Sequence, residues 1–214
     1  SGPGSMPAAR STSSGAPRVH ALDALAHIER ALAPANAVPA ATTPNVRDAA
    51  VAAIFRVAPQ GALELLMIER ASYAGDPWSG HIAFPGGRRE AHDFTLLDTA
   101  LRETREETGV DVLTHGRVLG ALERVNPMST ALPQLSIAPF VALLTRDVPL
   151  VLSDEVAGAF WVPLPALQRT DASRDVEVTL SNGTTRTVRA FVHDRYTIWG
   201  LTERILRDLL SRLA

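Results

Sequence analysis

A glycine pair that is followed shortly by a cluster of glutamates constrains this chain more than any other feature. The stretch reads AFPGGRREAHDFTLLDTALRETREETGV and runs from Ala83 to Val110. Its first part is typical of a strand that ends in a tight loop, and its second part is typical of a helix. That helix would carry Glu103, Glu106 and Glu107 with few cations to offset them. The concentration of negative charge next to two glycines therefore needs a physical explanation.

The helical period places the three carboxylates relative to the core. At about 100° per residue, five positions form one narrow stripe that is expected to be buried: Leu97, Ala100, Leu101, Thr104 and Thr108. Glu103 and Glu107 lie about 40° apart on the helix, and Glu106 lies about 60° to the other side of Glu103. The three acids are therefore predicted to share a flank beside the buried face, and Gly109 is predicted to end the helix.

Two interpretations of this acidic flank compete. A solvated acidic face is the simpler one, but Glu103 and Glu107 are a like-charge i, i+4 pair, which is unfavourable by roughly 0.2–0.5 kcal/mol. A divalent cation would offset this repulsion, because hard cations such as Mg²⁺ prefer oxygen ligands and often bridge carboxylates to phosphates. Gly86 and Gly87 lack a β-carbon, so the backbone there could approach a metal ion or a phosphate closely. The second interpretation accounts for both halves of the stretch.

These residues resemble the Nudix box. That motif is a glycine, five residues, an acid, seven residues, then Arg-Glu, an apolar residue, any residue, Glu-Glu, any residue, Gly and an apolar residue. The matching positions are Gly87, Asp93, Arg102, Glu103, Glu106, Glu107, Gly109 and Val110. The chain departs in having Asp93 as the first acid, eight residues between Asp93 and Arg102, and Thr104 in place of an aliphatic residue. With this expansion, the box is similar to that of the coenzyme A diphosphatase branch of the Nudix hydrolase family.

The resemblance implies both a fold and a chemistry. The fold would be an α/β/α sandwich with a mixed β-sheet packed between helices. The activity would be hydrolysis of a diphosphate (pyrophosphate) linkage in a nucleotide derivative, with Mg²⁺ or Mn²⁺ as the cofactor. The metal ligands implied are the carbonyl of Gly87 and the carboxylates of Glu103, Glu106 and Glu107. Asp93 and Arg102 would be structural and would brace the turn between loop and helix through an ion pair.

Further catalytic and substrate-binding residues are implied outside the helix. Glu155 precedes a predicted strand, where many relatives carry a loop glutamate, so it would complete the metal shell or take the proton from the attacking water. An exposed loop acid without a role is the alternative for Glu155. Arg70 ends a predicted strand and would hold a phosphate bidentately, with the backbone of Gly86 and Gly87 beside it. An ordinary surface arginine is the alternative for Arg70.

The sequence is compatible with several classes of substrate. Similarity to the coenzyme A branch extends in scattered blocks from Ala50 to Leu213, which makes coenzyme A or acyl-coenzyme A one expected substrate. Before the box, however, Gly75 and Asp76 replace the Leu-Arg of that branch, and Trp78 replaces its His. ADP-ribose or another nucleoside diphosphate derivative is therefore the alternative. A binding or regulatory Nudix module without catalysis is a third reading, although such modules normally lack box acids that this chain retains.

The remaining patterns predict three regions along the chain. Residues 1–19 are rich in Ser, Gly, Pro and Ala and are predicted to be a disordered tag and tail. Residues 20–46 are predicted to form a helix and a connector, and residues 47–214 the Nudix hydrolase domain. The predicted elements are strands at 49–57, 62–70, 81–84, 117–125, 137–144 and 159–164, a hairpin at 176–192, and helices at 20–33, 165–169 and 197–213.

Composition narrows the classes of partner. The net charge is −2 over 214 residues, so the chain has no overall positive field that would favour nucleic acid. No apolar run approaches the roughly 18 residues that span a membrane, and the first residues lack the apolar core of a signal peptide. The chain contains no cysteine, which is compatible with a cytoplasmic protein. The apolar stripe of the last helix could dock on the sheet or serve as a homodimer surface.

Overall fold

The computed structural model describes residues 15–38, 46–72, 80–127, 134–180 and 182–213, with the backbone alone for 15–19. Its strands are β1 (Arg47–Val57), β2 (Leu63–Arg70), β3 (Ile82–Ala83), β4 (Gly86–Arg88), β5 (Gly116–Ala121), β6 (Leu135–Leu144), β7 (Val156–Pro163), β8 (Ser173–Thr179), β9 (Thr185–His193) and β10 (Tyr196–Trp199). Its helices are α1 (Gly15–Ala31), α2 (Leu96–Thr108), α3 (Val112–His115), α4 (Leu164–Leu167) and α5 (Gly200–Ser211), with a short 3-10 turn η1 (Ala35–Ala37). Within these ranges, no helix is long and apolar enough to cross a bilayer.

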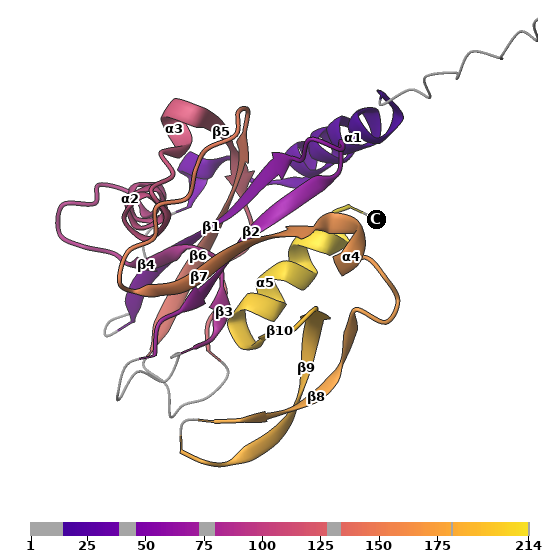
Figure 1. The fold of residues 1–214 in the computed structure, drawn as a ribbon. Coiled ribbons are helices and arrows are strands. Elements are labelled where there is room, and N and C mark those ends of the chain that lie inside the picture. The colour runs from indigo at the N-terminus through magenta and orange to yellow at the C-terminus, as the bar shows by residue number, and fades with distance from the viewer. Residues whose placement is uncertain (1–14, 39–45, 73–79, 128–133, 181, 214) are drawn as a thin grey trace, which may run out of the picture.

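A mixed sheet forms the centre of the molecule. Within the described residues it has seven strands, with β3-β2-β1-β6-β5 in order, β4 paired to β1, and β7 paired to β2. β1 and β6 run parallel from Arg47 opposite Leu135 to Phe55 opposite Leu143, and the other pairings are antiparallel. β10, β9 and β8 form a second, three-stranded sheet that projects from the main body (Figure 1). Because β1 is paired on both edges, it is the strand on which the site is built.

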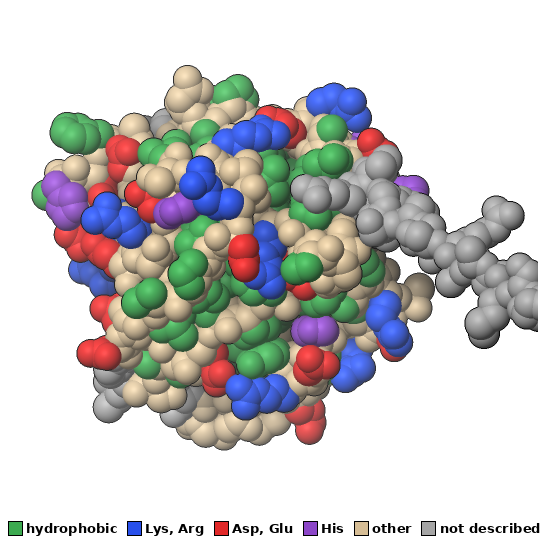
Figure 2. All heavy atoms as spheres, turned by 45° about the horizontal axis from the view of Figure 1, so that its top comes forward, with side chains coloured by type: hydrophobic (Ala, Val, Ile, Leu, Met, Phe, Trp, Pro, Cys, Tyr) green, Lys and Arg blue, Asp and Glu red, His purple; other side chains and the backbone are tan. Residues whose placement is uncertain are grey.

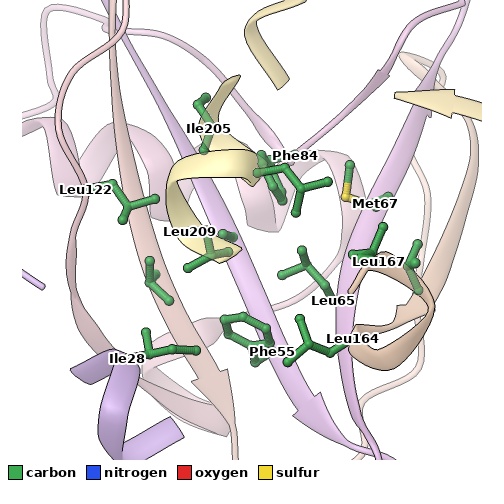
Figure 3. Packing of buried hydrophobic residues seen from close by; sticks show 14 of the residues in the cluster. Ile28, Phe55, Leu65, Met67, Phe84, Leu122, Leu164, Leu167, Ile205 and Leu209 are labelled. Carbon is green, nitrogen blue, oxygen red and sulfur yellow. The ribbon is translucent and has the colours of Figure 1, made fainter. Parts of the chain in front are cut away.

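Helices cover both faces of the sheet. Successive β1 residues point to opposite faces, so Ala53 and Phe55 enter one hydrophobic cluster while Ala52 and Ile54 enter the other. The first cluster receives side chains from α1, α4 and α5, as the close view of Ile28, Phe55, Leu65, Leu164 and Leu209 shows (Figure 3). The second cluster receives α2 and α3, which lie on the opposite side of the strands (Figure 1). The predicted mixed sheet packed between helices is confirmed.

Helix α2 has defined ends because of local hydrogen bonds. Thr95 caps its start: the Asp98 backbone N–H donates to the Thr95 Oγ1 at 3.1 Å, and the Thr95 N–H donates to the Asp98 carboxylate at 2.7 Å. This reciprocal capping box satisfies backbone donors that the first turn leaves unpaired. The helix ends at Gly109, which adopts a left-handed conformation with φ of +73°. The glutamates between these ends are therefore held on a rigid element.

The buried face of α2 differs from the predicted stripe. The buried residues are Leu96, Thr99, Ala100, Thr104, Glu107 and Thr108, whereas Leu97 and Leu101 are only partly buried. Two threonines tolerate burial because their hydroxyls donate to carbonyls one turn earlier: Thr104 to Ala100 at 2.7 Å and Thr108 to Thr104 at 2.6 Å. The face is thus rotated toward Glu107, and the three acids do not share one environment.

Several predicted boundaries are wrong for identifiable reasons. The glycine pair is not a loop but part of β4, because the backbone of β1 pairs with it. The strand predicted at 117–125 ends at Ala121, and Val125 forms only an isolated bridge to Ile137. A bulge between Val118 and Gly120 shifts the register of this strand against β6. The strand predicted at 81–84 is reduced to β3, and α3 was not predicted. α1 begins at Gly15 rather than at residue 20, and residues 1–14 lie outside the described part.

The C-terminal helix is also shorter than predicted. Residues 196–199, which include Ile198 of the predicted helical stripe, form β10 instead, because they pair with β9. Gly200, with φ of +68°, then turns the chain into α5. The remaining stripe packs on the sheet, where Ile205, Leu206 and Leu209 are buried in the first cluster. This face is therefore used within the chain.

Candidate active site

The short strand β4 brings the two glycines against β1 and α2. Gly86 pairs with Val51 and Gly87 with Ala50. A β-carbon on Gly86 would lie 2.3 Å from the Ala50 carbonyl oxygen, and one on Gly87 would lie 2.4 Å from the Glu103 carboxyl group. Gly86 is therefore required by the close approach of the β1 backbone, whereas a side chain at Gly87 would displace the Glu103 carboxylate from the position that it holds here.

Glu107 is a buried carboxylate held by this strand. Its side chain is 3% exposed, and its Oε2 accepts a hydrogen bond from the Gly86 N–H at 2.9 Å. The Arg70 Nη1 lies 3.8 Å from the other oxygen. Burial raises the pKa of Glu107 to about 7, while the Gly86 N–H and Arg70 oppose the rise, and the charges of Glu103 and Glu155 add to it. A cation that reached this carboxylate would stabilise its ionised form and lower its pKa.

Glu103 and Glu106 occupy different environments on the same helix. The Glu103 side chain is 15% exposed and lies against Gly87. Burial raises the pKa of Glu103, Arg102 opposes this, and the charges of Glu106 and Glu155 add to the rise. Glu106 is 58% exposed and pairs with Arg102 at 3.0 Å. The structure therefore places Glu103 and Glu107 at the glycine strand, and Glu106 at its solvent side.

Arg102 connects the helix to the loop that precedes it. Its Nε and Nη2 donate to the two carboxylate oxygens of Asp93 at 3.0 and 2.9 Å, and its Nη2 also donates to the Arg88 carbonyl at 3.0 Å. Asp93 is buried and accepts further hydrogen bonds from the Glu90 N–H and the Thr99 hydroxyl, both at 2.9 Å. The Arg102 hydrogen bonds hold the pKa of Asp93 well below its usual range. These bonds fix the loop on the helix.

Arg70 and Glu155 approach the same place from β2 and from the loop before β7. The Ala71 N–H donates to the Glu155 carbonyl at 2.8 Å, which fastens that loop beside Arg70. The charge of Glu155 contributes to the raised pKa of both Glu103 and Glu107, so this exposed acid lies near the site. The N–H of Gly86, which was expected to meet a phosphate, donates to Glu107 instead. Gly75, Asp76 and Trp78 lie outside the described residues.

A comparison with protein families identifies this arrangement. The family model for the NUDIX domain matches residues 46–181. The chain belongs to the Nudix hydrolase family. The match contains the glycine strand, α2 and the loop of Glu155, which are the parts that the geometry brings together.

Nudix relatives and structures resemble this chain over different lengths. The Nudix hydrolase NudL of Yersinia pestis is 31% identical over 152 residues, which cover 70% of this chain and 72% of NudL. A protein of Schizosaccharomyces pombe is 36% identical over 132 residues, which cover 60% of this chain but only 40% of that protein. A MutT/Nudix family protein of Enterococcus faecalis has the same fold, with a TM-score of 0.56, 18% identity, and coverage of 90% of this chain and 73% of that one. These matches establish family and fold.

The donor set of the Nudix box fits a hard divalent cation. Its side chains offer carboxylate oxygens, which Mg²⁺ and Mn²⁺ prefer, and Glu103 and Glu107 lie against adjacent glycines of β4. In the part of the chain that the structure describes, however, no three acidic or His side chains lie close enough together to hold one ion. Arg102 lies between two of these acids, since its Nη1 is 3.0 Å from both Glu103 Oε1 and Glu106 Oε2. A metal ion held by Glu103 and Glu106 together would have to displace this guanidinium nitrogen.

Sequence reasoning missed two features of the Nudix site. The first is the capping box at the start of α2, for which the Thr95-x-x-Asp98 spacing was a visible signal. The second is the burial of Glu107, for which the sequence offers no signal, because the N–H that compensates the carboxylate belongs to a strand far earlier in the chain.

The buried Glu107 predicts a pH-dependent stability. In metal-free protein the native state binds the Glu107 proton more tightly than the unfolded state, because the pKa of Glu107 rises from 4.5 to about 7 on folding. The free energy of unfolding therefore falls as pH rises from about 4.5 to about 7. Glu107→Gln removes this ionisation but keeps an oxygen that accepts from Gly86. In the presence of a chelator, this variant is expected to match wild type near pH 4 and to exceed its stability by about 3 kcal/mol at pH 8.

Urea unfolding measured from pH 4 to pH 8 tests this expectation. Glu177→Gln serves as the control, because Glu177 is an exposed acid on β8. A difference between Glu107→Gln and wild type that stays constant over the whole pH range would show that Glu107 ionises in its native site as it does in the unfolded chain.

Proposed function

We propose that this protein hydrolyses a diphosphate linkage in a nucleotide derivative with the help of Mg²⁺ or Mn²⁺. The observation that carries the proposal is the pair of shielded carboxylates, Glu103 and Glu107, against the glycine strand, with Arg70 beside Glu107. A diphosphate is densely anionic, so a site of carboxylates alone would repel it. The metal supplies the missing positive charge at the phosphate oxygens and a more acidic bound water.

The chain's own residues have distinct proposed roles. Glu103, Glu106, Glu107 and the Gly87 carbonyl would hold the metal ion. Arg70 would bind a phosphate oxygen, since its side chain is 29% exposed and its Nη1 lies 3.8 Å from the Glu107 carboxylate. The Asp93–Arg102 ion pair would keep the loop in place while these groups act.

The proposed general base is Glu155, with the box glutamates as the alternative. Its backbone is anchored to Ala71, and its charge acts on both Glu103 and Glu107. A base must come within hydrogen-bond distance of the water that it deprotonates, and the anchored backbone of Glu155 supports the proposal by keeping this residue near the two carboxylates. Glu155→Gln would separate the two alternatives, because loss of the base lowers kcat while metal binding is retained.

We propose that the substrate is a nucleoside diphosphate derivative. Coenzyme A or acyl-coenzyme A follows from the resemblance of the box and downstream blocks to that branch. ADP-ribose is the alternative, and a distant fold relative from Francisella tularensis, with 14% identity and a TM-score of 0.50, is described as an ADP-ribose pyrophosphatase bound to AMP and Mn. That likeness concerns the fold, so the two substrates must be separated by experiment.

A panel of substrates tests the proposed function. Purified protein with Mg²⁺ or Mn²⁺ is expected to release a nucleoside monophosphate from at least one of coenzyme A, acyl-coenzyme A, ADP-ribose, NADH or a diadenosine polyphosphate. A chelator should abolish the release. Metal binding by calorimetry without cleavage of any compound would reject the hydrolase and favour the regulatory module.

A further inference from the structure

A groove of about 500 Å³ opens at the edge of the sheet next to the Nudix box. Its lining comes from the start of β1 and from the segment that follows the glycine pair: Arg47, Asp48, Arg88, Arg89, Glu90 and Ala91. The side chains of these residues have no role in the site described above, where Arg88 and Glu90 contribute only backbone hydrogen bonds to the loop. Three of the six side chains are guanidiniums, and all three arginines are exposed.

The two acids of the groove already have cationic partners. Asp48 pairs with Arg124, a residue outside the groove, which lies beside it on the sheet. Glu90 lies 3.7 Å from Arg102 and 3.5 Å from His92. The positive charges of the groove are therefore not offset by the acids that line it.

The three arginines differ in how they are held. Arg89 donates to the carbonyls of Asp93 and Phe94, at 3.1 and 3.3 Å from its Nη2, so its guanidinium is fixed but its charge is not neutralised. Within the described ranges, Arg47 and Arg88 form no ion pair. Figure 2 shows that on the face it presents, Arg side chains are interspersed with Asp and Glu side chains. Against such a mixed surface, three arginines around one groove form a local positive site.

The groove and the candidate active site are adjacent, because neighbouring residues of β4 contribute to each of them. Gly87 faces the Glu103 carboxylate, and the next residue, Arg88, lines the groove. Successive residues of a strand point to opposite faces, so the carboxylates and Arg88 lie on two sides of the same short strand. The Arg88 carbonyl is also held by Arg102 at 3.0 Å, which fixes this strand relative to α2. A ligand that crosses the edge of β4 could contact both sites at once.

We propose that this groove binds a second phosphate group of the substrate, separate from the diphosphate that is cleaved. The inference rests on the proposed function and narrows it: the preferred substrates are nucleoside diphosphate derivatives that carry a further phosphate. Arginine suits this task, because its planar guanidinium binds two phosphate oxygens at once and stays charged at every physiological pH. The additional phosphate sits either on a ribose hydroxyl or in a longer phosphate chain.

Matched pairs of substrates that differ in phosphate content test the proposal. Coenzyme A is compared with 3′-dephospho-coenzyme A, NADPH with NADH, and diadenosine tetraphosphate with diadenosine diphosphate. Wild-type protein is expected to show a kcat/KM at least about tenfold higher for the richer member of at least one pair, which corresponds to a charge-assisted contact. The first two pairs identify a ribose phosphate, and the third identifies the phosphate chain.

Two substitutions connect this preference to the groove. In Arg47→Ala/Arg88→Ala protein the ratio of the two kcat/KM values is expected to fall to within about twofold of one. Arg186→Ala is the matched control, because Arg186 is an exposed arginine on β9, in the other sheet. A wild-type ratio near one for all three pairs, or a ratio that survives in the double variant, would overturn the proposal.

A binding measurement keeps the inference separate from the proposed activity. Titration of metal-free protein with adenosine 3′,5′-bisphosphate and with adenosine 5′-monophosphate requires no hydrolysis. The bisphosphate is expected to bind at least about tenfold more tightly to wild type, and this advantage should disappear in the double variant. If no compound is cleaved but the advantage is seen, the hydrolase proposal fails and the subsite stands. If the bisphosphate and the monophosphate bind equally tightly, and both members of each substrate pair are cleaved at equal rates, the proposed subsite is rejected and the hydrolase proposal stands.

Discussion

Replacing Glu106 with Gln is expected to lower kcat/KM for diphosphate hydrolysis by about a hundredfold or more, with little change in stability. Removal of a group that only supports a metal ligand typically costs 10- to 100-fold, so loss of a direct ligand should cost at least that much. Glu106 is the most informative of the three acids, because its side chain is 58% exposed and contributes nothing to the core. Surface substitutions of this kind usually change stability by within about 0.5 kcal/mol.

The measurement combines steady-state kinetics at several Mg²⁺ concentrations with thermal unfolding. Glu177→Gln is the control, since it removes one exposed negative charge from β8, far from the box in the chain. The expected loss should be partly recovered at high Mg²⁺ if the defect lies in metal affinity. Normal turnover by Glu106→Gln would show that Glu106 stays exposed during catalysis and does not bind the metal ion.

Replacing Arg102 with Met is expected to destabilise the protein by about 3 kcal/mol, which corresponds to a fall in melting temperature of about 6–12 °C. The methionine keeps much of the volume but leaves the Asp93 carboxylate buried without its cation. The Asp93 side chain is 2% exposed and that of Arg102 is 14% exposed, so solvent cannot replace the lost contacts. The loop between β4 and α2 should loosen, and activity should fall with it.

Arg117→Met is the matched control for this experiment. Arg117 also forms a two-oxygen ion pair, with Glu29, but both side chains are largely in solvent. Exposed pairs of this kind contribute about 0–1 kcal/mol. Both variants lose an ion pair, but only Arg102→Met leaves a buried carboxylate without its cation. The difference between their losses of stability therefore measures the effect of burial, and equal losses would contradict the structural role of Arg102.

The pH dependence of the Arg102→Met defect provides a second test. Because the pKa of Asp93 is held below its usual range, its ionisation stabilises the native state above pH ~4, and this contribution is lost as pH falls through the lowered pKa. Arg102→Met should therefore be most destabilising at neutral pH, and its difference from wild type should shrink in acid. A defect of equal size at pH 3 and pH 7 would point to lost packing rather than to a lost ion pair.

Short-range features were predictable because a residue's neighbours in the chain decide them. The helix over the acidic stretch and its end at Gly109 follow from the helical period and from the conformational freedom of glycine. The hairpin of β8 and β9 also follows from local chemistry, and Gly183 in its loop has a positive φ of +80°. Asn182-Gly183 does not form a two-residue turn with positive φ at both positions, because Asn182 lacks a positive φ and Leu180 pairs with Thr184 across the loop. Residues 197–199 were wrongly predicted as helix, because their pairing with β9 is a tertiary feature.

The residue types of the candidate site were visible in the sequence, but their arrangement in space was not. The types and spacing of Glu103, Glu106 and Glu107 indicated a cation site, because carboxylates on one helical flank repel each other. The difference in their exposure could not be predicted, since it depends on where β4 crosses α2. The groove at Arg47 and Arg88 was equally hidden, because its two arginines come from segments that only the β1–β4 pairing brings together.

The sequence by itself determined the family and the residue types that the candidate site offers to a cation, because both depend on residue types at short spacing. The tertiary structure alone decided which glutamate is buried, which backbone N–H compensates it and which arginines meet at one groove. The physical reason is that burial and backbone pairing are properties of β1, β4 and α2 together. A carboxylate such as Glu107 acquires its raised pKa only when strands from distant parts of the chain exclude water from it.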